Sequence, residues 1–325
     1  MRKLFLSIVC LFISQTIFAQ EWHSINTKSE ESYSTRLIKS TNESVVIDLS
    51  LNGFYTNQTS LPNSVIITNE DMAPLSEAGQ PNIPSLSIPI IINDMGKMDV
   101  RVSKVEYLEY NDIEIAPSKG EFPRSINPDD VPYTYGDVYQ QNEFFPATNV
   151  KLDSPYILRD FRAQNIIVTP FAYNPVTKTL RVMHKMTIEV VSTKEEGENE
   201  LARRSNTINM DSEFEKMYSN RFINYKESGA KYDIIEEEGD LLIICHDAFM
   251  DAMQPFVEWK RATGRKTTMV GTSVAGTSAD NVKNYITTQY EDNPNLVHVL
   301  LVGDYQQLPG KYLTMGSGYF DDYSG

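Results

Sequence analysis

The chain has 325 residues, enough for two folded domains, because one hydrophobic core usually serves about 100–200 residues. Hydrophobic residues make up 41% of the chain and aromatic residues 10%, so packed globular domains are expected. The formal net charge of −15 argues against nucleic-acid binding, which needs a cationic surface to meet the phosphates.

The N-terminus has the order of features found in a secretory signal peptide. Two basic residues precede an apolar run from Leu4 to Ile13, and a short polar stretch ends at Ala19 and Gln20. We therefore predict a signal peptide over residues 1–19 that is cleaved between Ala19 and Gln20. No later stretch approaches the ~18 apolar residues of a membrane span, so a secreted or cell-surface protein with no membrane span is expected. Cys245 is then the only cysteine of the mature chain, which excludes an intramolecular disulfide.

Residues 20–193 alternate between apolar and polar side chains, which is the period of a half-buried strand. The clearest case is TLRVMHKMTIEVV, which follows turn residues in FAYNPVTKTL, so FAY and LRVMHKMTIEVV are predicted to form a β-hairpin. Its inward face is expected to hold Leu180, Val182, Met186, Ile188 and Val190. VVIDLSL, SVIIT, MDVRVSKVEYLEY and NIIVTPF add further strands without intervening helices, which favours a β-sandwich.

Two polar stretches interrupt this pattern, GEFPRSINPDDVPY at 120–133 and STKEEGENELARRS at 192–205. Neither could bury its backbone or its charges, so both are predicted to be exposed loops. Basic residues in exposed loops are accessible to proteases, which makes Arg124 and the pair Arg203 and Arg204 candidate processing sites. For Arg124, an ordinary loop arginine is at least as good an interpretation.

After residue 240 the pattern changes. LLIIC, KTTMVG and HVLLVGD are short apolar runs, and helical spacing lies between them in DAFMDAMQPFVEWKRATG and SADNVKNYITTQYED. Pro255 suits the first turn of the first helix, and Gly264 suits its C-terminal end. The second helix is expected to direct four residues inward, namely Val282, Tyr285, Ile286 and Tyr290. Apolar strands that alternate with helices predict a parallel sheet covered on both faces, the opening half of a doubly wound α/β domain.

Cys245 and His246 have the residue types of a nucleophile and its base. Adjacent residues of a strand project to opposite faces of the sheet, so an extended pair cannot direct sulfur and imidazole at one substrate. A lone cysteine that ends an apolar strand is far more typically a small buried hydrophobe. The sequence also contains no HExxH, GxSxG, Walker or CxxC spacing, so we find no complete catalytic constellation in these 325 residues.

Gly303 and Asp304 follow the last apolar run. The carboxyl ends of parallel strands form the ligand-facing edge of such a sheet, and a glycine there permits a sharp exit of the chain. A carboxylate at this edge could bind a hard cation such as Ca²⁺. An aspartate at this position also commonly caps the following turn, so both interpretations stay open.

Several stretches, in this order behind a signal peptide, resemble the gingipains, which are secreted cysteine peptidases with a caspase-like fold. DLLIICHDAFMDAMQPFVEWKRATGRKTTMV and NLVHVLLVGDYQQLP resemble the start of that family's catalytic domain, chiefly through F-V-E-W-K-x-x-x-G at 256–264 and V-L-L-V-G-D-x-x-x-x-P at 299–309. APLSEAGQPNIPSLSIPI and PFAYNPVTKTLRV resemble the family's propeptide. The resemblance covers nearly all of the mature chain.

The resemblance implies an α+β multidomain protein. Its N-terminal β-sandwich propeptide would span 20–205 and act as an intramolecular inhibitor, and a connecting segment would span 206–231. The first half of a caspase-like doubly wound α/β peptidase domain would follow at 232–325. The resemblance places the propeptide cleavage between Lys231 and Tyr232, where lysine replaces the arginine that the family leads us to expect.

The connecting segment contains an amphipathic stretch, DSEFEKMYSNRF at 211–222, which is expected to form a helix that leads into the junction. A helix that simply docks on the sandwich is the alternative. The resemblance further implies that Asp304 is a calcium ligand, and that the catalytic cysteine and histidine lie beyond Gly325.

The function implied is that of a secreted cysteine endopeptidase zymogen that hydrolyses protein or peptide substrates after basic residues, represented here by an inactive N-terminal fragment. The alternative is a secreted binding or adhesion protein with a non-catalytic α/β domain. A strand-end histidine in the continuation of the chain, followed about one βα unit later by a strand-end cysteine, would favour the peptidase over the binding protein. A nucleotide-binding enzyme is disfavoured, because the first apolar run exits through CHDAFM with no glycine-rich turn to admit a pyrophosphate.

Overall fold

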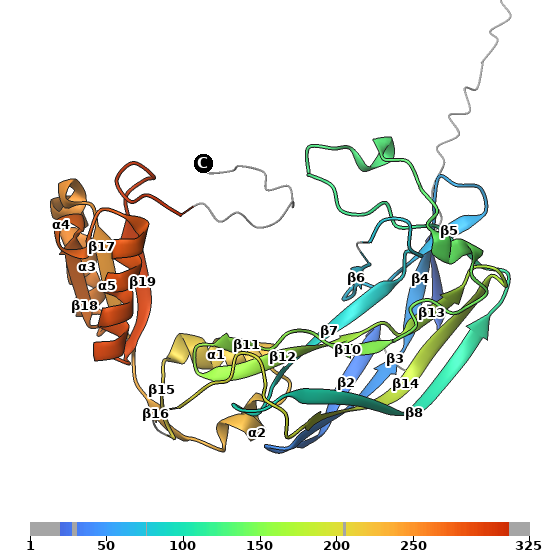
Figure 1. Cartoon of the computed structure of the whole chain (residues 1–325), viewed down its shortest axis with the longest axis horizontal. Coiled ribbons are helices and arrows are strands. Elements are labelled where there is room, and N and C mark those ends of the chain that lie inside the picture. The colour runs from blue at the N-terminus through green and yellow to red at the C-terminus, as the bar shows by residue number, and fades with distance from the viewer. Residues whose placement is uncertain (1–19, 28–30, 76, 204–205, 312–325) are drawn as a thin grey trace, which may run out of the picture.

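The structure is a computed structural model that describes residues 20–27, 31–75, 77–203 and 206–311. Figure 1 shows a strand-rich body at one end, a smaller body of helices and strands at the other, and a connecting region between them. The predicted signal peptide with Ala19, and Arg204 of the candidate processing pair, lie outside the described residues, while Gln20 opens the first strand. None of the described helices is long and apolar enough to cross a membrane.

The strand-rich body contains three sheets. The first sheet consists of β1 (Gln20–Ser24), β4 (Gly53–Gln58), β5 (Ser64–Thr68) and β9 (Glu114–Ile115), in the order β1-β4-β5-β9. The second consists of β6 (Ala73–Pro74), β7 (Pro84–Ile91), β10 (Val150–Leu152), β11 (Tyr156–Leu158) and β12 (Phe161–Val168), in the order β10-β12-β7-β6 with β11 also on β12. The third consists of β2 (Tyr33–Ser40), β3 (Ser44–Leu51), β8 (Met98–Tyr110), β13 (Phe171–Asn174) and β14 (Thr179–Ser192), in the order β13-β14-β3-β2 with β8 also on β14.

The predicted hairpin is confirmed. β13 pairs antiparallel with β14, with Phe171 opposite Val182 and Asn174 opposite Thr179. All five residues predicted to face inward on β14 are at most 2% exposed. They belong to one core that also includes apolar side chains of β3, β4, β7 and β12, so the sheets enclose a shared interior. This strand-rich body is called the sandwich below. Burying each such side chain stabilises the fold by about 1.5–3 kcal/mol, which explains why the two-residue period predicted this region well.

The two polar stretches of this body differ from each other. Residues 120–133 are largely exposed and contain only the short 3₁₀ turn η1 (Pro128–Asp130), as predicted; a second turn, η2 (Asp137–Gln140), follows them. The described part of the second stretch, residues 192–203, is exposed at Lys194, Glu195 and Glu198 as predicted, but it also makes buried contacts that the prediction of an exposed loop did not include. Arg162, which is fully buried, donates from its guanidinium to the carbonyl of Glu198, and Arg203 is itself largely buried in an ion pair. Buried partners supplied by other segments thus satisfy backbone and charge that the stretch could not satisfy alone.

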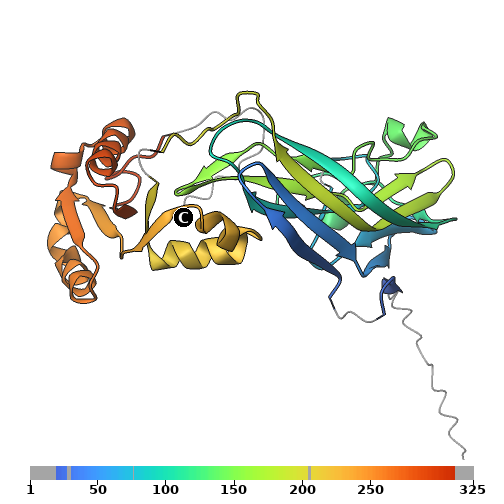
Figure 2. The same cartoon turned by 90° about the horizontal axis from the view of Figure 1, so that it is seen from below.

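The connecting region is built from α1 (Ser212–Arg221), α2 (Tyr225–Gly229), β15 (Thr207–Met210) and β16 (Asp233–Glu236). Seen from below in Figure 2, these helices lie between the two bodies. The predicted helix over 211–222 is therefore present, and it packs on the outer face of β12, where Tyr218 and Phe222 share a hydrophobic cluster with Phe161 and Ala163. It thus docks on the sandwich and also leads into the junction.

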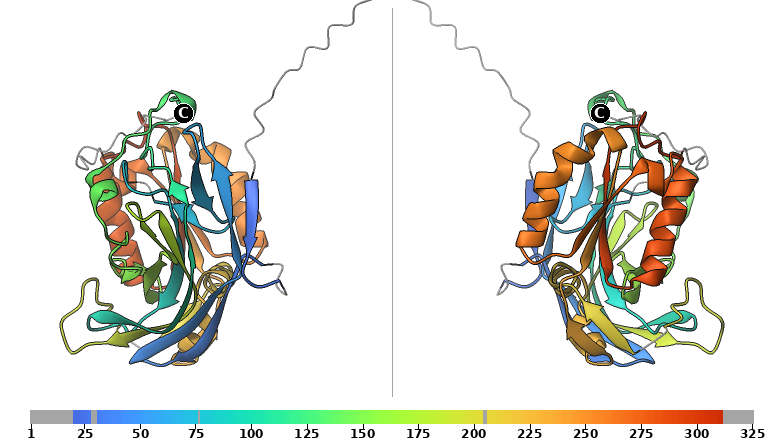
Figure 3. Two further views of the ribbon diagram at one scale, coloured as in Figure 1. Left: turned by 90° about the vertical axis from the view of Figure 1, so that its right-hand side faces the viewer. Right: turned by 90° about the vertical axis from the view of Figure 1, so that its left-hand side faces the viewer.

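The smaller body contains β17 (Asp240–Cys245), β18 (Thr267–Gly271) and β19 (Leu296–Val302), which form a parallel sheet in the order β18-β17-β19. Its helices are α3 (Met250–Ala262), preceded by the 3₁₀ turn η3 (Asp247–Phe249), α4 (Thr272–Ala275) and α5 (Ala279–Asp292). Figure 3 shows α3 and α5 on opposite sides of the strands. Alternate residues of β17 enter two different cores, one with α3 and one with α4 and α5, so both faces of the sheet are covered as predicted.

Two local predictions in this body are wrong. Pro255 lies inside α3 and not in its first turn, because the helix begins at Met250, directly after η3. Tyr290 is 47% exposed, whereas Val282 is buried and Tyr285 and Ile286 are partly buried against the core. The helical period placed Tyr290 near the inward face, but it lies in the last turn of α5, beyond the apolar face that the strands cover.

Candidate functional site

Cys245 ends β17 and is fully buried among Ile243, Val257 and neighbouring apolar residues. Burial raises the pKa of its thiol, and the nearby carboxylate of Asp247 raises it further. A thiol with a raised pKa is a poor nucleophile because little thiolate is present at neutral pH. The cysteine therefore behaves as a small core residue, in agreement with the sequence interpretation.

His246 does not act on the neighbouring sulfur either. Its side chain caps η3, where Nδ1 accepts a hydrogen bond from the backbone N–H of Ala248 at 3.3 Å. The Cys245 Sγ instead lies 3.4 Å from the backbone carbonyl oxygen of His246. The two adjacent residues thus have separate structural roles and do not form a catalytic pair.

Asp304 follows β19 at the carboxyl edge of the parallel sheet. Gly303 before it has φ of 150°, which a glycine adopts readily and which lets the chain turn sharply. The Asp304 carboxylate accepts a hydrogen bond from the backbone N–H of Gln306 at 2.8 Å, so in this structure it caps the following turn. It is exposed, and among the described residues no group of three metal-ligating side chains includes it. Because Ca²⁺ takes about 6–8 oxygen ligands, this carboxylate alone does not constitute a calcium site.

The second carboxylate at this edge, Asp247, already accepts hydrogen bonds from neighbouring residues. It accepts hydrogen bonds from the hydroxyls of Thr272 and Ser273 and from the Ser273 backbone N–H, at 2.8–3.1 Å. These hydrogen bonds, led by the Ser273 hydroxyl, lower the pKa of Asp247. Asp247 therefore ties the end of β17 to the start of α4, next to Cys245.

An ion cluster joins the connecting region to the α/β body. Arg265 lies 3.2 Å from Asp211 and 2.9 Å from Glu238, and it donates a hydrogen bond to the carbonyl of Gly239 at 3.0 Å. The Asp211 side chain is fully buried, caps the N-terminus of α1, and accepts from the backbone N–H groups of Glu213 and Gly239. Asp211 thus connects α1 to the strand β17 that follows Gly239.

The same cluster has the composition of a metal site. Asp211, Glu213 and His298 bring three ligand-type atoms within 4.8 Å of one another. His298 Nε2 lies 3.0 Å from Glu213 in a geometry that permits an ion pair when the imidazole is protonated but that does not make a hydrogen bond. However, the Arg265 guanidinium already supplies a positive charge beside Asp211 and would repel a metal cation. The described geometry therefore favours an ion cluster over a metal centre.

A parallel strand pair lies beside this ion cluster. β15 and β16 are in register from Thr207 opposite Asp233 to Met210 opposite Glu236. Arg159 of the sandwich also donates to the carbonyl of Pro294, and the side chains of Asn209 and Asn295 are hydrogen-bonded. Contacts between residues before the predicted junction and residues after it therefore hold the strand-rich body and the α/β body together.

The predicted cleavage junction is not an open loop. Lys231 and Tyr232 are each partly buried at the end of α2. Burial lowers the pKa of Lys231, partly offset by the charge of Asp94, and burial raises the pKa of Tyr232. Asn224, fully buried just before α2, exchanges two hydrogen bonds of 2.8 Å with the backbone of Ile91 and so fixes α2 to the edge of β7.

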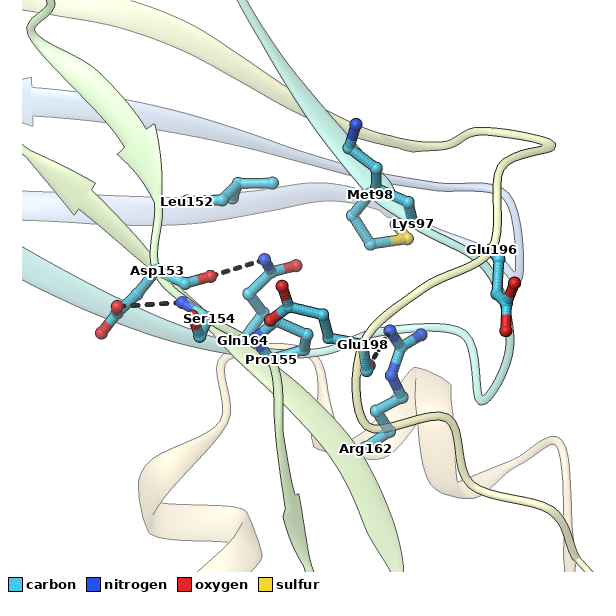
Figure 4. Close-up of a pocket in the computed structure, with 10 residues that line it drawn as sticks. All are labelled: Lys97, Met98, Leu152, Asp153, Ser154, Pro155, Arg162, Gln164, Glu196 and Glu198. Atoms are coloured by element: carbon cyan, nitrogen blue, oxygen red, sulfur yellow. Dashed lines mark hydrogen bonds between the residues drawn. The ribbon is translucent and has the colours of Figure 1, made fainter.

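A cavity of about 420 Å³ opens at the end of the sandwich, and Figure 4 shows the residues that line it. Arg162 and Gln164, two residues apart on β12, reach it from the sandwich interior. The guanidinium of Arg162 donates to the carbonyls of Asn93, Gly96 and Glu198 at 2.6–2.9 Å. Its principal role in this structure is therefore to hold two loops over the end of the sandwich.

The sequence did not predict Asp94, Asp211 or Arg265 as contact residues. Of these, Asp211 had a usable signal, because aspartate directly before the helical stretch SEFEKMYSNR is a typical N-cap. Asp94 and Arg265 lie in turns whose partners are distant in sequence, and no local pattern marks them.

The comparisons with known proteins place the chain in a family. The family model described as Propeptide_C25 matches residues 26–231, and the model described as Peptidase family C25 matches residues 234–323. The chain therefore has the sequence organisation of a propeptide followed by the start of a peptidase domain. It belongs to peptidase family C25, the gingipain family that the sequence motifs resembled, and it comprises the propeptide and the start of the peptidase domain.

Gingipain R1 and gingipain R2 of Porphyromonas gingivalis are similar to the chain. They are 34% identical over 284 residues and 35% identical over 259 residues, which is 85% and 78% of this chain. The chain spans only 28% and 35% of the lengths of these relatives. Among solved structures, the complex of Porphyromonas gingivalis RgpB pro- and mature domains matches with a TM-score of 0.54 at 34% identity, covering 59% of this chain and 97% of the matched chain.

Proposed function

We propose that the chain is the N-terminal part of a secreted or cell-surface cysteine endopeptidase zymogen that cleaves proteins or peptides after basic residues. The observation that carries this proposal is the order of the two family matches, because a C25 propeptide at 26–231 is followed directly by a C25 peptidase domain from residue 234. This order disfavours the alternative of a binding or adhesion protein with a non-catalytic α/β domain.

The α/β body is proposed to be the first half of a caspase-like, doubly wound domain. Three parallel strands with helices on both faces support this assignment. In the proposed enzyme a cysteine thiolate attacks the peptide carbonyl while a histidine handles the proton, and water then hydrolyses the acyl-enzyme. We place both catalytic residues beyond Gly325, because the burial of Cys245 and the capping role of His246 leave neither free for this chemistry.

The domain limits and processing sites are also proposals. Residues 20–205 would form the inhibitory propeptide, 206–231 the connecting segment, and cleavage between Lys231 and Tyr232 would release the peptidase domain. The change of family match between residues 231 and 234 supports this position. Arg203 with Arg204 remains a secondary processing site in the proposal, although the buried ion pair of Arg203 requires local opening before a peptidase can reach it.

Calcium is a further proposal. Asp304 would supply one oxygen to a structural calcium ion whose other ligands come from residues outside the described ranges. Its position at the carboxyl edge of the sheet supports the assignment, because that edge is where ligands of α/β domains gather.

The proposed activity is tested by treating the mature full-length protein with a thiol alkylator and assaying peptidyl substrates that end in lysine or arginine. We expect hydrolysis before alkylation and a loss of at least about 100-fold after it, because only the thiolate can attack the carbonyl. Hydrolysis that survives alkylation, or that is absent beforehand, would exclude a cysteine peptidase of this specificity.

Replacing Cys245 by serine is expected to leave kcat/KM of the complete enzyme within about twofold of the wild-type value, since Cys245 is a core residue and not the nucleophile. A modest loss of stability, about 1–2 kcal/mol, is expected because a hydroxyl replaces a buried thiol. Assays at a temperature well below unfolding separate the two effects. A folded but inactive Cys245→Ser enzyme would contradict the assignment.

A further inference from the structure

Asp94, Arg203 and Tyr232 form a compact contact, which we call the Tyr232 clamp. Arg203 binds the Asp94 carboxylate through two hydrogen bonds, at 2.5 Å from Nε and 3.0 Å from a terminal nitrogen. Its guanidinium lies 4.3 Å from the centre of the Tyr232 ring, and the Tyr232 hydroxyl donates to the same carboxylate at 3.2 Å. Each of the three side chains therefore contacts both of the others.

The clamp joins three distant segments of the chain. Asp94 follows β7, Arg203 lies at the end of the stretch 192–203, and Tyr232 follows α2. Arg203 is anchored further by a hydrogen bond of 2.5 Å to the carbonyl of Asp160, and the Tyr232 ring packs against Phe161. The side chains of Arg203 and Asp94 are 16% and 17% exposed, so the pair is largely shielded from water and stronger than a surface ion pair.

The backbone around Lys231 is closed by hydrogen bonds of its own. The N–H groups of Lys231 and Tyr232 donate to the carbonyls of Ser228 and Gly229, and the N–H of Asp233 donates to Asn206. A peptidase binds its substrate as an extended strand, so it cuts a bond only where the surrounding backbone can unfold locally. In this structure the Lys231–Tyr232 bond lies in a turn, with the side chain after the bond held by the clamp.

We propose that the Tyr232 clamp controls access to the Lys231–Tyr232 bond, so that opening of the clamp, and not the cutting step, sets the rate at which the propeptide is severed. The same carboxylate holds Arg203, whose guanidinium cannot enter a peptidase pocket while it binds Asp94. One event therefore exposes both basic processing positions. The inference rests on the proposed cleavage between Lys231 and Tyr232.

The test uses a lysine-specific serine endopeptidase added to the full precursor, whose own thiol is first blocked by alkylation so that only the added enzyme cuts. Cleavage after Lys231 is followed by mass spectrometry as the appearance of the Tyr232 N-terminus. Cleavage after the exposed Lys194 serves as the reference within the same molecule. The measured quantity is the ratio of the two rates, which cancels differences in protease concentration.

Asp94→Asn is expected to raise this ratio about tenfold, because cleavage of a protected bond follows the population of the locally open state. Tyr232→Phe, which removes only the hydroxyl contact, is expected to raise it about two- to fivefold. The matched control is Asp99→Asn, the same chemical change at an exposed aspartate of β8, which should leave the ratio unchanged.

If neither cleavage rate rises in Asp94→Asn, so that it behaves like the wild type and Asp99→Asn, the proposal is overturned. If Asp94→Asn loosens the whole sandwich, both cuts accelerate together, and the Tyr232→Phe variant then decides: an unchanged ratio in that variant also overturns the clamp. The natural N-terminus of the mature enzyme is measured separately. An N-terminus other than Tyr232 would refute the proposed junction while the protease ratio still reports on the clamp.

Discussion

Replacing Asp211 by alanine is expected to lower the free energy of unfolding by about 3–5 kcal/mol, the usual cost of removing one partner from a buried ion pair. Asp211 is fully buried, and its loss leaves Arg265 with the more exposed Glu238 and Glu213 as counter-charges. It also removes the cap from α1 and the acceptor for the Gly239 N–H. We expect the damage to be greatest where α1 meets the α/β body.

Urea denaturation and amide hydrogen exchange at Gly239 and along β16 measure this effect. Glu238→Gln is the matched control, since Glu238 contacts the same arginine but is 54% exposed and should cost less than about 1 kcal/mol. Equal effects of the two substitutions would mean that Asp211 is not the central contact of the ion cluster.

The pH dependence of this contact has a definite sign. Burial alone would raise the pKa of Asp211, but hydrogen bonds from the N–H groups of Gly239 and Glu213, together with the charge of Arg265, hold it below its ordinary value of 3.8. A carboxylate whose pKa is lowered by folding contributes its full stabilisation at pH values above its pKa in the unfolded chain. It loses that contribution as the pH falls through its pKa in the folded protein. The contact should therefore persist from neutral pH to about pH 4 and weaken below it.

Replacing Arg162 by methionine is expected to cost about 2–4 kcal/mol, because three backbone carbonyls lose a charged donor. Methionine keeps much of the side-chain volume, so the loss reports on hydrogen bonding more than on packing. Arg162 and Glu198 both line the open cavity, so water that enters it can replace part of the lost hydrogen bonding, and the expected cost stays below the sum of three fully buried losses. Burial lowers the pKa of Arg162, with Glu200 and Asp94 acting in the opposite direction.

Thermal and urea denaturation measure the stability change, and Arg101→Met at an exposed position of β8 is the matched control. Hydrogen exchange adds a local readout, because Glu200 accepts from the N–H groups of Gly96 and Gly197 in the loops that Arg162 holds. Faster exchange at these two amides is expected in Arg162→Met alone. Unchanged stability and exchange would show that the loops are held by other contacts.

The sequence predicted those parts of the fold in which local period and burial agree. β14 alternates cleanly because one face lies in the shared core, and β17 is wholly apolar because helices cover both faces of its sheet. β15 and β16 were not predicted, since they are four residues each, and β16 is exposed along its length. Their pairing depends on the helices between them and is invisible to a local pattern.

The contacts of the candidate site were hidden from the sequence for a different reason. Arg203 pairs with Asp94 across 109 residues, and Arg265 pairs with Asp211 across 54 residues. A charged stretch is usually solvated, so the prediction of an exposed loop over 192–205 followed the ordinary rule. The exception arises because partners brought together by the tertiary fold satisfy the buried charges of Arg162 and Arg203.

Hydrolysis of lysyl and arginyl peptide substrates by the full-length precursor, measured before and after it is cut, tests whether the chain is the start of a cysteine peptidase zymogen. We expect a latent precursor, activity that appears together with the Tyr232 N-terminus, and complete inhibition of that activity by thiol alkylation. An active uncut precursor, or a cut form with the Tyr232 N-terminus that hydrolyses no such substrate, would contradict the proposed zymogen.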